Sequence, residues 1–312
     1  MSDRTWSVAE HEAGTRLDKY LSNADRLASR GRASEALARG KVFINGTEAT
    51  PAQAGVRLAT GDRVRVWMDR PGSSRRPVAL GEAHDLAVLY EDDAIVVLNK
   101  PAGILSVPLE RQGSARSVYD DLRKYLSRRG RRRPHVVHRI DRDTSGLVVF
   151  AKTALAQQQL KEQFRRHLPE RVYLALVYGT PEPAEGTWQD RLVWDTRALI
   201  QKETHHRDPK GSDAICRYRV VERLGAASLV EVKLVTGKRN QIRLQARLRG
   251  HTLVGERRYV YGPEALRPIR FPRQALHAWR LAFGHPSDGR PLQFEAPLPG
   301  DMAELVERLR RT

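Results

Sequence analysis

A group of polar, turn-forming residues interrupts two apolar runs near the middle of the chain, in residues 134–152. Asp141 comes directly after the run Val-Val-His-Arg-Ile, where we expect a strand to hold its carboxylate at the mouth of a cleft. A single carboxylate held in this way suits nucleophilic attack or the stabilisation of developing positive charge. Spacing alone leaves a structural role equally open for Asp141. For residues 143–146 we expect a turn whose side chains satisfy the local backbone.

The sequence lacks the motifs that are typical of several other kinds of catalytic site. The sequence contains no glycine-rich dinucleotide motif, no phosphate loop ending in Gly-Lys-Ser/Thr, no His-Glu-x-x-His and no Cys-x-x-Cys pair. His135 and His138 are three residues apart in an apparent strand and Cys216 is the only thiol, so metal binding is disfavoured. We expect one of the two histidines to pack and the other to form hydrogen bonds. His205 and His206 lie in a polar run and are expected to be solvated. We therefore expect neither a metal nor another cofactor.

The charge of the chain indicates a polyanionic partner. Of its 312 residues, 55 are Lys or Arg and 37 are Asp or Glu, which gives a formal net charge of +18, and 45 of the basic residues are Arg. Guanidinium groups bind phosphate oxygens in pairs and stack on bases, which favours a structured nucleic acid over simple counter-ions. A genome rich in G and C would explain the preference for Arg over Lys, but not the excess of basic over acidic residues.

The expected location is the cytoplasm. One cysteine cannot form an internal disulfide, and the start of the chain contains no apolar stretch of the length found in signal peptides. No window approaches the roughly 20 apolar residues of a membrane span, and the mean hydropathy is −0.56. No basic amphipathic helix suited to a membrane surface is evident. We expect no membrane association.

Residues 1–70 are predicted to form a small domain of two helices and a hairpin. The expected elements are helices at 15–21 and 30–39, a hairpin over 41–49 and a strand at 62–67. The Asn-Gly pair in the hairpin suits a tight turn with positive φ angles. This set resembles the small RNA-binding domain named after ribosomal small-subunit protein four. The resemblance makes Arg30, Arg32 and Lys41 candidate RNA contacts.

The rest of the chain is expected to be a linker, 71–84, and an α+β domain, 85–312. The linker gathers Pro, Gly, Ser and Arg without periodicity. Predicted strands lie at 94–98, 146–150, 172–177, 228–235 and 276–283, and predicted helices at 154–167, 240–249 and 301–310. Strands and helices do not alternate regularly, which favours a mixed, mostly antiparallel sheet over a doubly wound fold. In the first of these helices we expect Leu155, Leu160 and Phe164 to form the apolar face.

Residues 138–152, His-Arg-Ile-Asp-Arg-Asp-Thr-Ser-Gly-Leu-Val-Val-Phe-Ala-Lys, resemble the signature HRLDxxTSGLLxxAK of the RluA-type pseudouridine synthases. Further matches follow in the family's order at 89–103, 171–179, 236–243, 273–278 and 283–286. The resemblance spans residues 86–299. It implies the pseudouridine synthase fold and the isomerisation of specific uridines in RNA. The product is an isomer of the substrate, in keeping with the lack of nucleotide and metal motifs.

The resemblance assigns roles to three residues. Asp141 corresponds to the catalytic aspartate, Arg243 to the arginine that pairs with it, and Tyr173 to the tyrosine that stacks on the target base and can assist late proton removal. Burial alone would favour the protonated carboxyl, so a cation beside Asp141 is physically required. Arg239 and Arg247 share a spacing of four with Arg243, so we expect one helical stripe, with Arg247 in solvent. Attack on the sugar carbon, charge stabilisation and removal of a sugar proton all stay open.

A target uridine within folded RNA must be extruded from its stack, and a side chain must fill the vacated space. Arg139 is the candidate for that role, with a phosphate contact as its alternative. Three consecutive residues, Arg131, Arg132 and Arg133, are expected to order on the RNA backbone. Further RNA contacts are expected from Arg142 and Lys238.

Four positions depart from the family pattern. Lys238, Asn240 and Gln245 stand where the family usually has an arginine and two histidines, and Glu256 stands in place of its aspartate. Asn and Gln keep their hydrogen-bonding ability but carry no charge. We expect both to lie behind the reacting groups and activity to survive. The changes leave the subfamily and the target site open.

The sequence thus predicts a monomeric RNA pseudouridine synthase. Ribosomal RNA of the large subunit is the favoured substrate and transfer RNA the alternative. A second hypothesis is a non-catalytic RNA-binding or ribosome-assembly factor that keeps the fold, motivated by the basic charge and the changes at Asn240 and Gln245. A third, a metal-dependent nuclease using Asp141 and Asp143, is disfavoured because alternate residues of a strand point to opposite faces.

Overall fold

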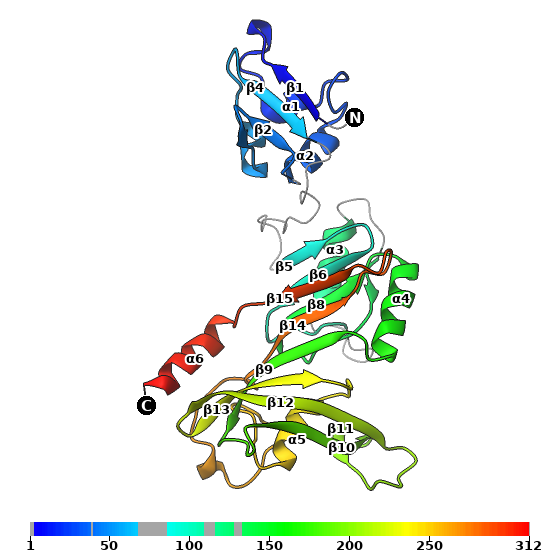
Figure 1. The fold of residues 1–312 in the computed structure, drawn as a ribbon, viewed down its shortest axis with the longest axis vertical. Coiled ribbons are helices and arrows are strands. Elements are labelled where there is room, and N and C mark those ends of the chain that lie inside the picture. The colour runs from blue at the N-terminus through cyan, green and yellow to red at the C-terminus, as the bar shows by residue number, and fades with distance from the viewer. Residues whose placement is uncertain (1–2, 39, 68–85, 109–115, 128–132, 312) are drawn as a thin grey trace. The chain divides into compact units, whose positions relative to one another are not determined.

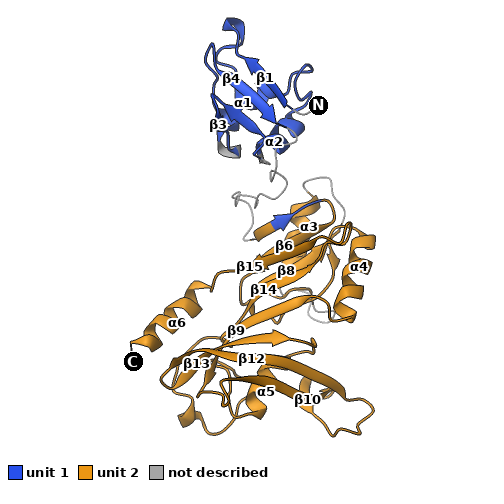
Figure 2. Ribbon diagram, in the orientation of Figure 1, with its two compact units in different colours: residues 1–83, 90–92 blue, residues 84–89, 93–312 orange. Residues whose placement is uncertain are grey.

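The computed structural model describes residues 3–38, 40–67, 86–108, 116–127 and 133–311. The chain divides into two compact units, one formed by residues 1–83 and 90–92 and the other by residues 84–89 and 93–312 (Figure 2). The expected linker, 71–84, lies outside the described residues. Within the described part of the chain, no helix is long and apolar enough to cross a membrane.

The first unit is a four-stranded antiparallel sheet with two short helices. Its strands are β1 (Asp3–Ser7), β2 (Val42–Ile44), β3 (Thr47–Glu48) and β4 (Arg63–Trp67), in the order β1-β4-β2-β3. Its helices are α1 (Leu17–Leu21) and α2 (Arg30–Ala38), with 3-10 turns at Glu10–Glu12 and Pro51–Gly55. Leu17, Tyr20 and Leu37 from the two helices join Val42 and Val64 of the sheet in one core.

The hairpin predicted in this unit is present, because Asn45 and Gly46 adopt φ angles of 51° and 82° between β2 and β3. The side chain of Asn45 also donates to Asp62 (2.8 Å) and accepts from the backbone N–H of Arg63 (2.8 Å), which joins the hairpin to β4. Strand β1 was not among the predicted elements. Its residues alternate between exposed and half-buried, so they carry little apolar signal.

The second unit is built on an eleven-stranded, mixed sheet (Figure 1). Nine strands follow the order β11-β10-β12-β13-β9-β14-β8-β6-β5, while β15 pairs with β14 and β7 with β8. Strands β8 and β14 run parallel, whereas β9, β13, β12 and β10 pair antiparallel in turn. Their bounds are β5 Ala87–Glu91, β6 Ile95–Lys100, β7 His135–Val136, β8 Ser145–Ala151, β9 Glu170–Tyr178, β10 Glu185–Asp195, β11 Ile200–Glu203, β12 Ser212–Leu224, β13 Ala227–Leu234, β14 Leu276–Gly284 and β15 Pro291–Glu295. The expected α+β class, with a mixed and mostly antiparallel sheet, is confirmed.

The helices of this unit are α3 (Val118–Ser127), α4 (Ala154–Arg165), α5 (Gln241–Leu248) and α6 (Gly300–Arg310), with a 3-10 turn at Glu264–Leu266. Helix α3 was not predicted. The apolar face expected for α4 is partly wrong, because Leu155 is exposed, whereas Ala156 and Leu160 are buried. Leu155 lies in the first turn beside the capping residue Thr153, whose side chain accepts from the N–H of Ala156 at 3.1 Å.

Strands β8, β9 and β14 come together at the centre of the sheet. Gly146 of β8 adopts a φ of 111°, and a Cβ atom there would lie 2.2 Å from the backbone oxygen of Ala278 in β14. Only glycine permits this close approach of the two backbones. On the adjoining face, Ile140 packs in one core with Tyr173 of β9 and Ile242 of α5. This core brings the chain before β8 close to the start of α5.

Candidate active site

Asp141 lies on a loop, not at the end of a strand. We expected the run before it to be a strand, but β7 ends at Val136. Instead, the hydroxyl of Ser106 donates to the backbone oxygen of Ile140 (2.7 Å) and accepts from its N–H (3.1 Å). Ser106 and the side chain of Ile140 are both buried. These contacts satisfy the backbone that a strand would have paired, and they fix the position of Asp141.

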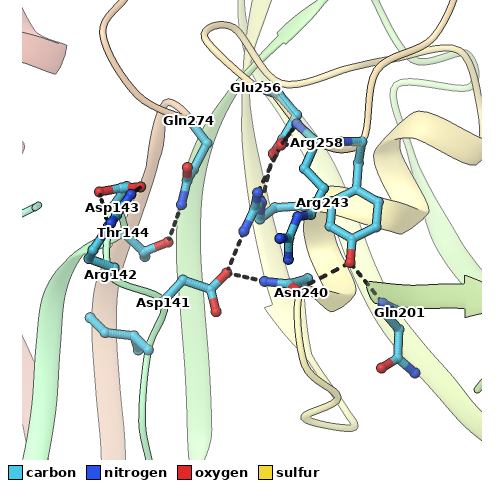
Figure 3. A network of polar contacts seen from close by, with 12 residues as sticks. Asp141, Arg142, Asp143, Thr144, Gln201, Asn240, Arg243, Glu256, Arg258 and Gln274 are labelled. Atoms are coloured by element: carbon cyan, nitrogen blue, oxygen red, sulfur yellow. Dashed lines mark hydrogen bonds and ion pairs between the residues drawn. The ribbon is translucent and has the colours of Figure 1, made fainter. Parts of the chain in front are cut away.

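One oxygen of the Asp141 carboxylate accepts hydrogen bonds from two side chains at the start of α5. Oδ2 accepts from Nη1 of Arg243 at 3.1 Å and from Nδ2 of Asn240 at 2.6 Å (Figure 3). Oδ1 accepts no hydrogen bond from the residues that the structure describes, and 26% of the side chain is exposed. The carboxylate is therefore oriented through one oxygen, while the other oxygen is available to a reacting group.

Arg243 joins two carboxylates. Its Nε and Nη2 donate to the two oxygens of Glu256 at 2.6 and 2.8 Å, which leaves Nη1 for Asp141. Burial opposes the charge of Arg243, but the hydrogen bonds and charge of Glu256, together with Asp141, outweigh it and raise its pKa. Glu256 is itself buried. Burial raises its pKa, yet the bonds and charge of Arg243 lower it further, so the net shift is downward.

Glu256 is also bound by the backbone, since its Oε1 accepts the N–H groups of Arg257, Arg258 and Tyr259 at 2.7–3.2 Å. We noted Glu256 in the sequence only as a departure from the family pattern. The ion pair that Glu256 forms with Arg243 was not predicted. A carboxylate 13 residues after an arginine carries no local signal of pairing.

Asn240 contacts Asp141 directly, so the expectation that it lies behind the reacting groups is wrong. It precedes α5 in the left-handed conformation, with a φ of 53°, which asparagine tolerates better than most residues. Its Oδ1 accepts from the hydroxyl of Tyr259 (3.2 Å), and that hydroxyl accepts from the N–H of Gln201 (2.9 Å). A buried tyrosine anchored to β11 thus orients the amide that binds Asp141.

Gln245, by contrast, lies inside the core as expected of a supporting residue. Its amide donates to Asp190 (2.7 Å) and to the backbone oxygen of Ala214 (3.0 Å), and its carbonyl accepts from Cys216 (3.3 Å) and Gln241 (3.1 Å).

Burial raises the pKa of the Cys216 thiol to about 12. Among the described residues, no group of three His, Cys, Asp or Glu is placed to hold a metal ion.

Tyr173 lies in the middle of the sheet, where β9 pairs with β13 on one side and β14 on the other. Its side chain is largely buried in the core that also holds Ile140. Burial raises the pKa of Tyr173 to about 12, although the nearby charge of Arg171 opposes this shift. Its hydroxyl forms no hydrogen bond with the residues that the structure describes. The phenol is therefore protonated at neutral pH.

Lys100 is a residue of the site region that the sequence analysis missed. Its buried Nζ donates to the backbone oxygens of Pro101 (2.8 Å), Ile104 (2.8 Å) and Arg142 (2.9 Å). Burial lowers its pKa to about 7, although the charges of Asp143 and Asp141 oppose this. Lys100 thus ties the turn after β6 to the loop of Asp141. The only sequence signal was its position in the Lys-Pro-Ala-Gly turn.

Comparison with known proteins identifies this constellation. Residues 94–248 match the sequence profile of the RNA pseudouridylate synthase family. An uncharacterised RNA pseudouridine synthase of Bacillus subtilis is 35% identical, with 98% of this chain and 97% of the relative covered. The chain belongs to the RNA pseudouridylate synthase family. It is an isomerase that converts uridine to pseudouridine in RNA, as predicted.

Further relatives and solved structures agree with the assignment. The ribosomal large subunit pseudouridine synthases D of Nitrosomonas europaea and Zymomonas mobilis are each 34% identical, covering 97% of this chain and 87% and 96% of their own lengths. The structure of human RNA pseudouridylate synthase domain containing 4 superposes with a TM-score of 0.60 at 21% identity, over 72% of this chain and 93% of that one. This likeness confirms the pseudouridine synthase fold.

The basic residues expected to bind RNA differ in their solvent exposure. Arg139, Arg133, Arg30 and Arg32 are exposed, while Lys41 and Lys238 are half-buried. Arg142 is exposed and pairs with Asp143 at 3.1 Å. These two side chains lie together on the side of Asp141 away from Arg243 (Figure 3). Arg131 and Arg132 lie outside the described residues.

The predicted stripe of three arginines is wrong in the synthase. Arg239 precedes α5 and lies over the ring of Trp194, with its guanidinium carbon 3.9 Å from the ring centre. Arg247 is half-buried and donates to the backbone oxygen of Val260 at 3.2 Å, so it is not simply solvated. The left-handed residue Asn240 explains the difference, because it ends the helical spacing between Arg239 and Arg243.

His138 has a structural role in the synthase. The ring of His138 accepts from the N–H of Val149 (3.1 Å) and stacks on Phe164 with ring centres 4.7 Å apart. Burial lowers the pKa of His138, so the ring is neutral. One histidine therefore performs both of the roles, packing and hydrogen bonding, that we had divided between His135 and His138. His205 and His206 are exposed, as expected.

Proposed function

We propose that this enzyme modifies uridines in ribosomal RNA of the large subunit, with Asp141 as its catalytic group. The main support for this proposal is the geometry of the Asp141 carboxylate. Arg243 and Asn240 donate hydrogen bonds to Oδ2, while Oδ1 accepts none from the described residues. The name of the relatives from Nitrosomonas europaea and Zymomonas mobilis supports the choice of RNA. The net charge of +18 suits a large polyanionic substrate.

The reaction breaks the bond between ribose C1′ and N1 of the base, turns the uracil, joins C5 to C1′ and finally removes the proton from C5. Asp141 acts at the sugar, where an ionised carboxylate attacks C1′, stabilises its positive charge or removes the C2′ proton. Arg243 places its positive charge beside this carboxylate, with Nη1 3.1 Å from Oδ2 of Asp141. Tyr173 offers an aromatic surface beside Asp141 on which the free base can stack while it turns.

The target nucleotide must leave its stack to reach Asp141. Arg139, which is exposed two residues before Asp141, is proposed to fill the gap that the base leaves. Arg133, Arg142 and Lys238 are proposed to bind the RNA strand near the target nucleotide. In the first unit, Arg30, Arg32 and Lys41 are proposed to bind RNA independently of catalysis. We propose that the enzyme acts as a monomer in the cytoplasm.

The test is release of tritium from RNA labelled at C5 of uridine. Large-subunit ribosomal RNA from a strain that lacks the gene is the substrate, and transfer RNA from the same strain is the parallel sample. We expect release from ribosomal RNA by the native enzyme and none by Asp141→Asn, which keeps the size and hydrogen bonds of the side chain. Release by Asp141→Asn at the native rate would overturn the catalytic assignment, and release from transfer RNA alone would overturn the choice of RNA.

Mapping of pseudouridines in total RNA from the same strain would identify the position. A site lost from large-subunit ribosomal RNA, and restored by the native gene but not by the Asp141→Asn gene, is the expected result.

A further inference from the structure

Arg171 is a buried cation that the catalytic arrangement does not use. It lies on β9 with 8% of its surface exposed. Among the residues that the structure describes, no carboxylate pairs with it. Its Nη2 donates to the backbone oxygen of Val235 at 3.3 Å, and its Nε is buried without a partner. A charge in this setting is costly unless an anion compensates for it. Burial accordingly lowers the pKa of Arg171.

The guanidinium has one edge that a ligand can reach. Its Nη1 makes no hydrogen bond with the described residues, and it is not among the enclosed polar atoms. Gly237 covers this edge, and a Cβ atom at that position would lie 2.3 Å from Nη1. Gly237 itself is exposed. A side chain at position 237 would therefore collide with the guanidinium, and only an exposed glycine lies between Nη1 and the surface at this point.

This edge of Arg171 lies beside the proposed catalytic site. Arg171 and Tyr173 are two residues apart on one strand, so their side chains share a face and are separated by roughly 7 Å along it. The charge of Arg171 acts on the Tyr173 hydroxyl. Lys238 and Arg239 follow Gly237 directly and add positive charge to the same loop. A nucleic-acid strand that presents a base to Tyr173 would bring its backbone to this loop.

We propose that Arg171 binds a backbone phosphate of the RNA strand next to the target nucleotide, at the edge bordered by Gly237. A phosphodiester carries the negative charge that would compensate the buried guanidinium, and one of its free oxygens can accept from Nη1. A uracil carbonyl would leave the charge uncompensated. The inference rests on the proposed function in that Tyr173 faces the target base. It adds a binding site for the strand to the site of the reaction.

Two variants of Arg171's site test the proposal, with one control. Arg171→Met removes the charge but keeps an unbranched side chain. Gly237→Ala keeps the charge and places a methyl group against Nη1. Arg165→Gln, on exposed α4 with its partner Glu162 (2.7 Å), controls for the loss of any arginine. The RNA is an in vitro transcript containing the uridine mapped in the deletion strain. The measurements are its dissociation constant at several salt concentrations, the KM and kcat of tritium release, and the unfolding temperature of the free enzyme.

We expect both Arg171→Met and Gly237→Ala to weaken RNA binding by about tenfold or more. The slope of log K against log salt should fall by about 0.7 to 0.9 for Arg171→Met, since one phosphate contact is lost. KM should rise more than kcat falls. Removing an uncompensated buried charge should not lower the unfolding temperature of the free enzyme. Arg165→Gln should leave KM unchanged.

Unchanged KM and salt slope in both variants would overturn the proposal, as would a lower unfolding temperature for Arg171→Met with native KM, which would show a structural role. These outcomes are distinct from failure of the proposed function. If the native enzyme releases no tritium from ribosomal RNA, the proposed function is wrong. If it does, and Arg171→Met and Gly237→Ala bind RNA normally, only this inference is wrong.

Discussion

The amide of Asn240 and the guanidinium of Arg243 donate to the same oxygen of Asp141, at 2.6 and 3.1 Å. One donor is neutral and the other is charged. Arg243 is held by Glu256 and Asn240 by Tyr259, so each donor has its own support. The two supports can be removed separately, and the effects on the carboxylate should differ.

Replacing Asn240 should change the pH dependence of catalysis. Asn240→Asp places a second carboxylate beside Asp141, and like charges oppose ionisation. The acidic limb of kcat/KM should therefore move to higher pH by about one unit or more. Asn240→His introduces a group that titrates near pH 6.5, so its profile should gain an additional ionisation. Tritium release between pH 5 and 9 measures both, and profiles that superimpose on the native one would show that Asn240 has no influence on the carboxylate.

Removing the hydroxyl of Tyr259 should loosen Asn240 without touching Asp141. Tyr259→Phe leaves the side chain of Asn240 and the N–H of Gln201 without their partner, which costs about 1–3 kcal/mol of stability. The single-turnover rate should fall severalfold because the amide loses its fixed orientation. Urea unfolding and rapid-quench kinetics measure the two effects. Tyr261→Phe, on an exposed tyrosine, is the matched control. A native rate in Tyr259→Phe would argue against a positioning role.

Glu256→Gln should impair catalysis through Arg243. The variant keeps the shape of the side chain but removes the charge that holds the guanidinium, and breaking a buried pair costs about 3–5 kcal/mol of stability. The rate should fall because Arg243 loses the charged partner that fixes the orientation of its guanidinium beside Asp141. The KM for RNA should change less than kcat, since Glu256 is buried. An unaltered kcat in a folded Glu256→Gln enzyme would contradict this account.

Lys100 should make the stability of the protein depend on pH. Its pKa in the folded state is about 7, below the usual value of 10.5 for a lysine side chain. Between these values the unfolded chain binds more protons, so the free energy of unfolding should rise with pH from about 7 to 10, by at most about 1.4 kcal/mol per unit. Below pH 7 both states are protonated and this dependence ends. Lys100→Met should be less stable at every pH and should lack this rise, as measured by urea unfolding.

The first unit should contribute to RNA affinity and not to the chemical step. Replacing Arg30, Arg32 and Lys41 by Gln should weaken binding and reduce the salt slope by as much as about 0.9 per residue. Single-turnover release from RNA that is already bound should persist. Filter binding at several salt concentrations and pre-bound single-turnover assays separate the two. An unchanged slope would show that these residues do not contact phosphates.

The strands with runs of buried apolar residues were predictable from sequence, and several other elements were not. Strands β6, β8, β9, β13 and β14 each begin or continue with several buried residues in succession and were all located. In strand β10 only Trp188 and Leu192 are buried, in an irregular pattern, so its apolar signal is weak. Helix α3 was missed although Val118, Leu122 and Leu126 recur at helical spacing.

In the candidate site, some residues were predictable from sequence and the contacts between them were not. Pairing of Asp141 with Arg243 followed from motif resemblance. Contact between Asp141 and Asn240, which are 99 residues apart, depends on the backbone conformation at Asn240 and on the tertiary position of Tyr259. Neither can be derived from local patterns. The loop conformation of Asp141 depends on Ser106, another distant residue. Residue types were predictable here, whereas the contacts that orient them were a property of the fold.

The trio of Asp141, Arg243 and Glu256 also has a consequence for what the enzyme admits. Two carboxylates and one guanidinium leave one formal negative charge in this cluster, in a chain that is otherwise strongly cationic. A sugar-phosphate backbone should be repelled from this charge, whereas an uncharged nucleobase should not. The cluster should thus discriminate by charge before any chemistry begins, and favour the ring of the nucleotide over its phosphates.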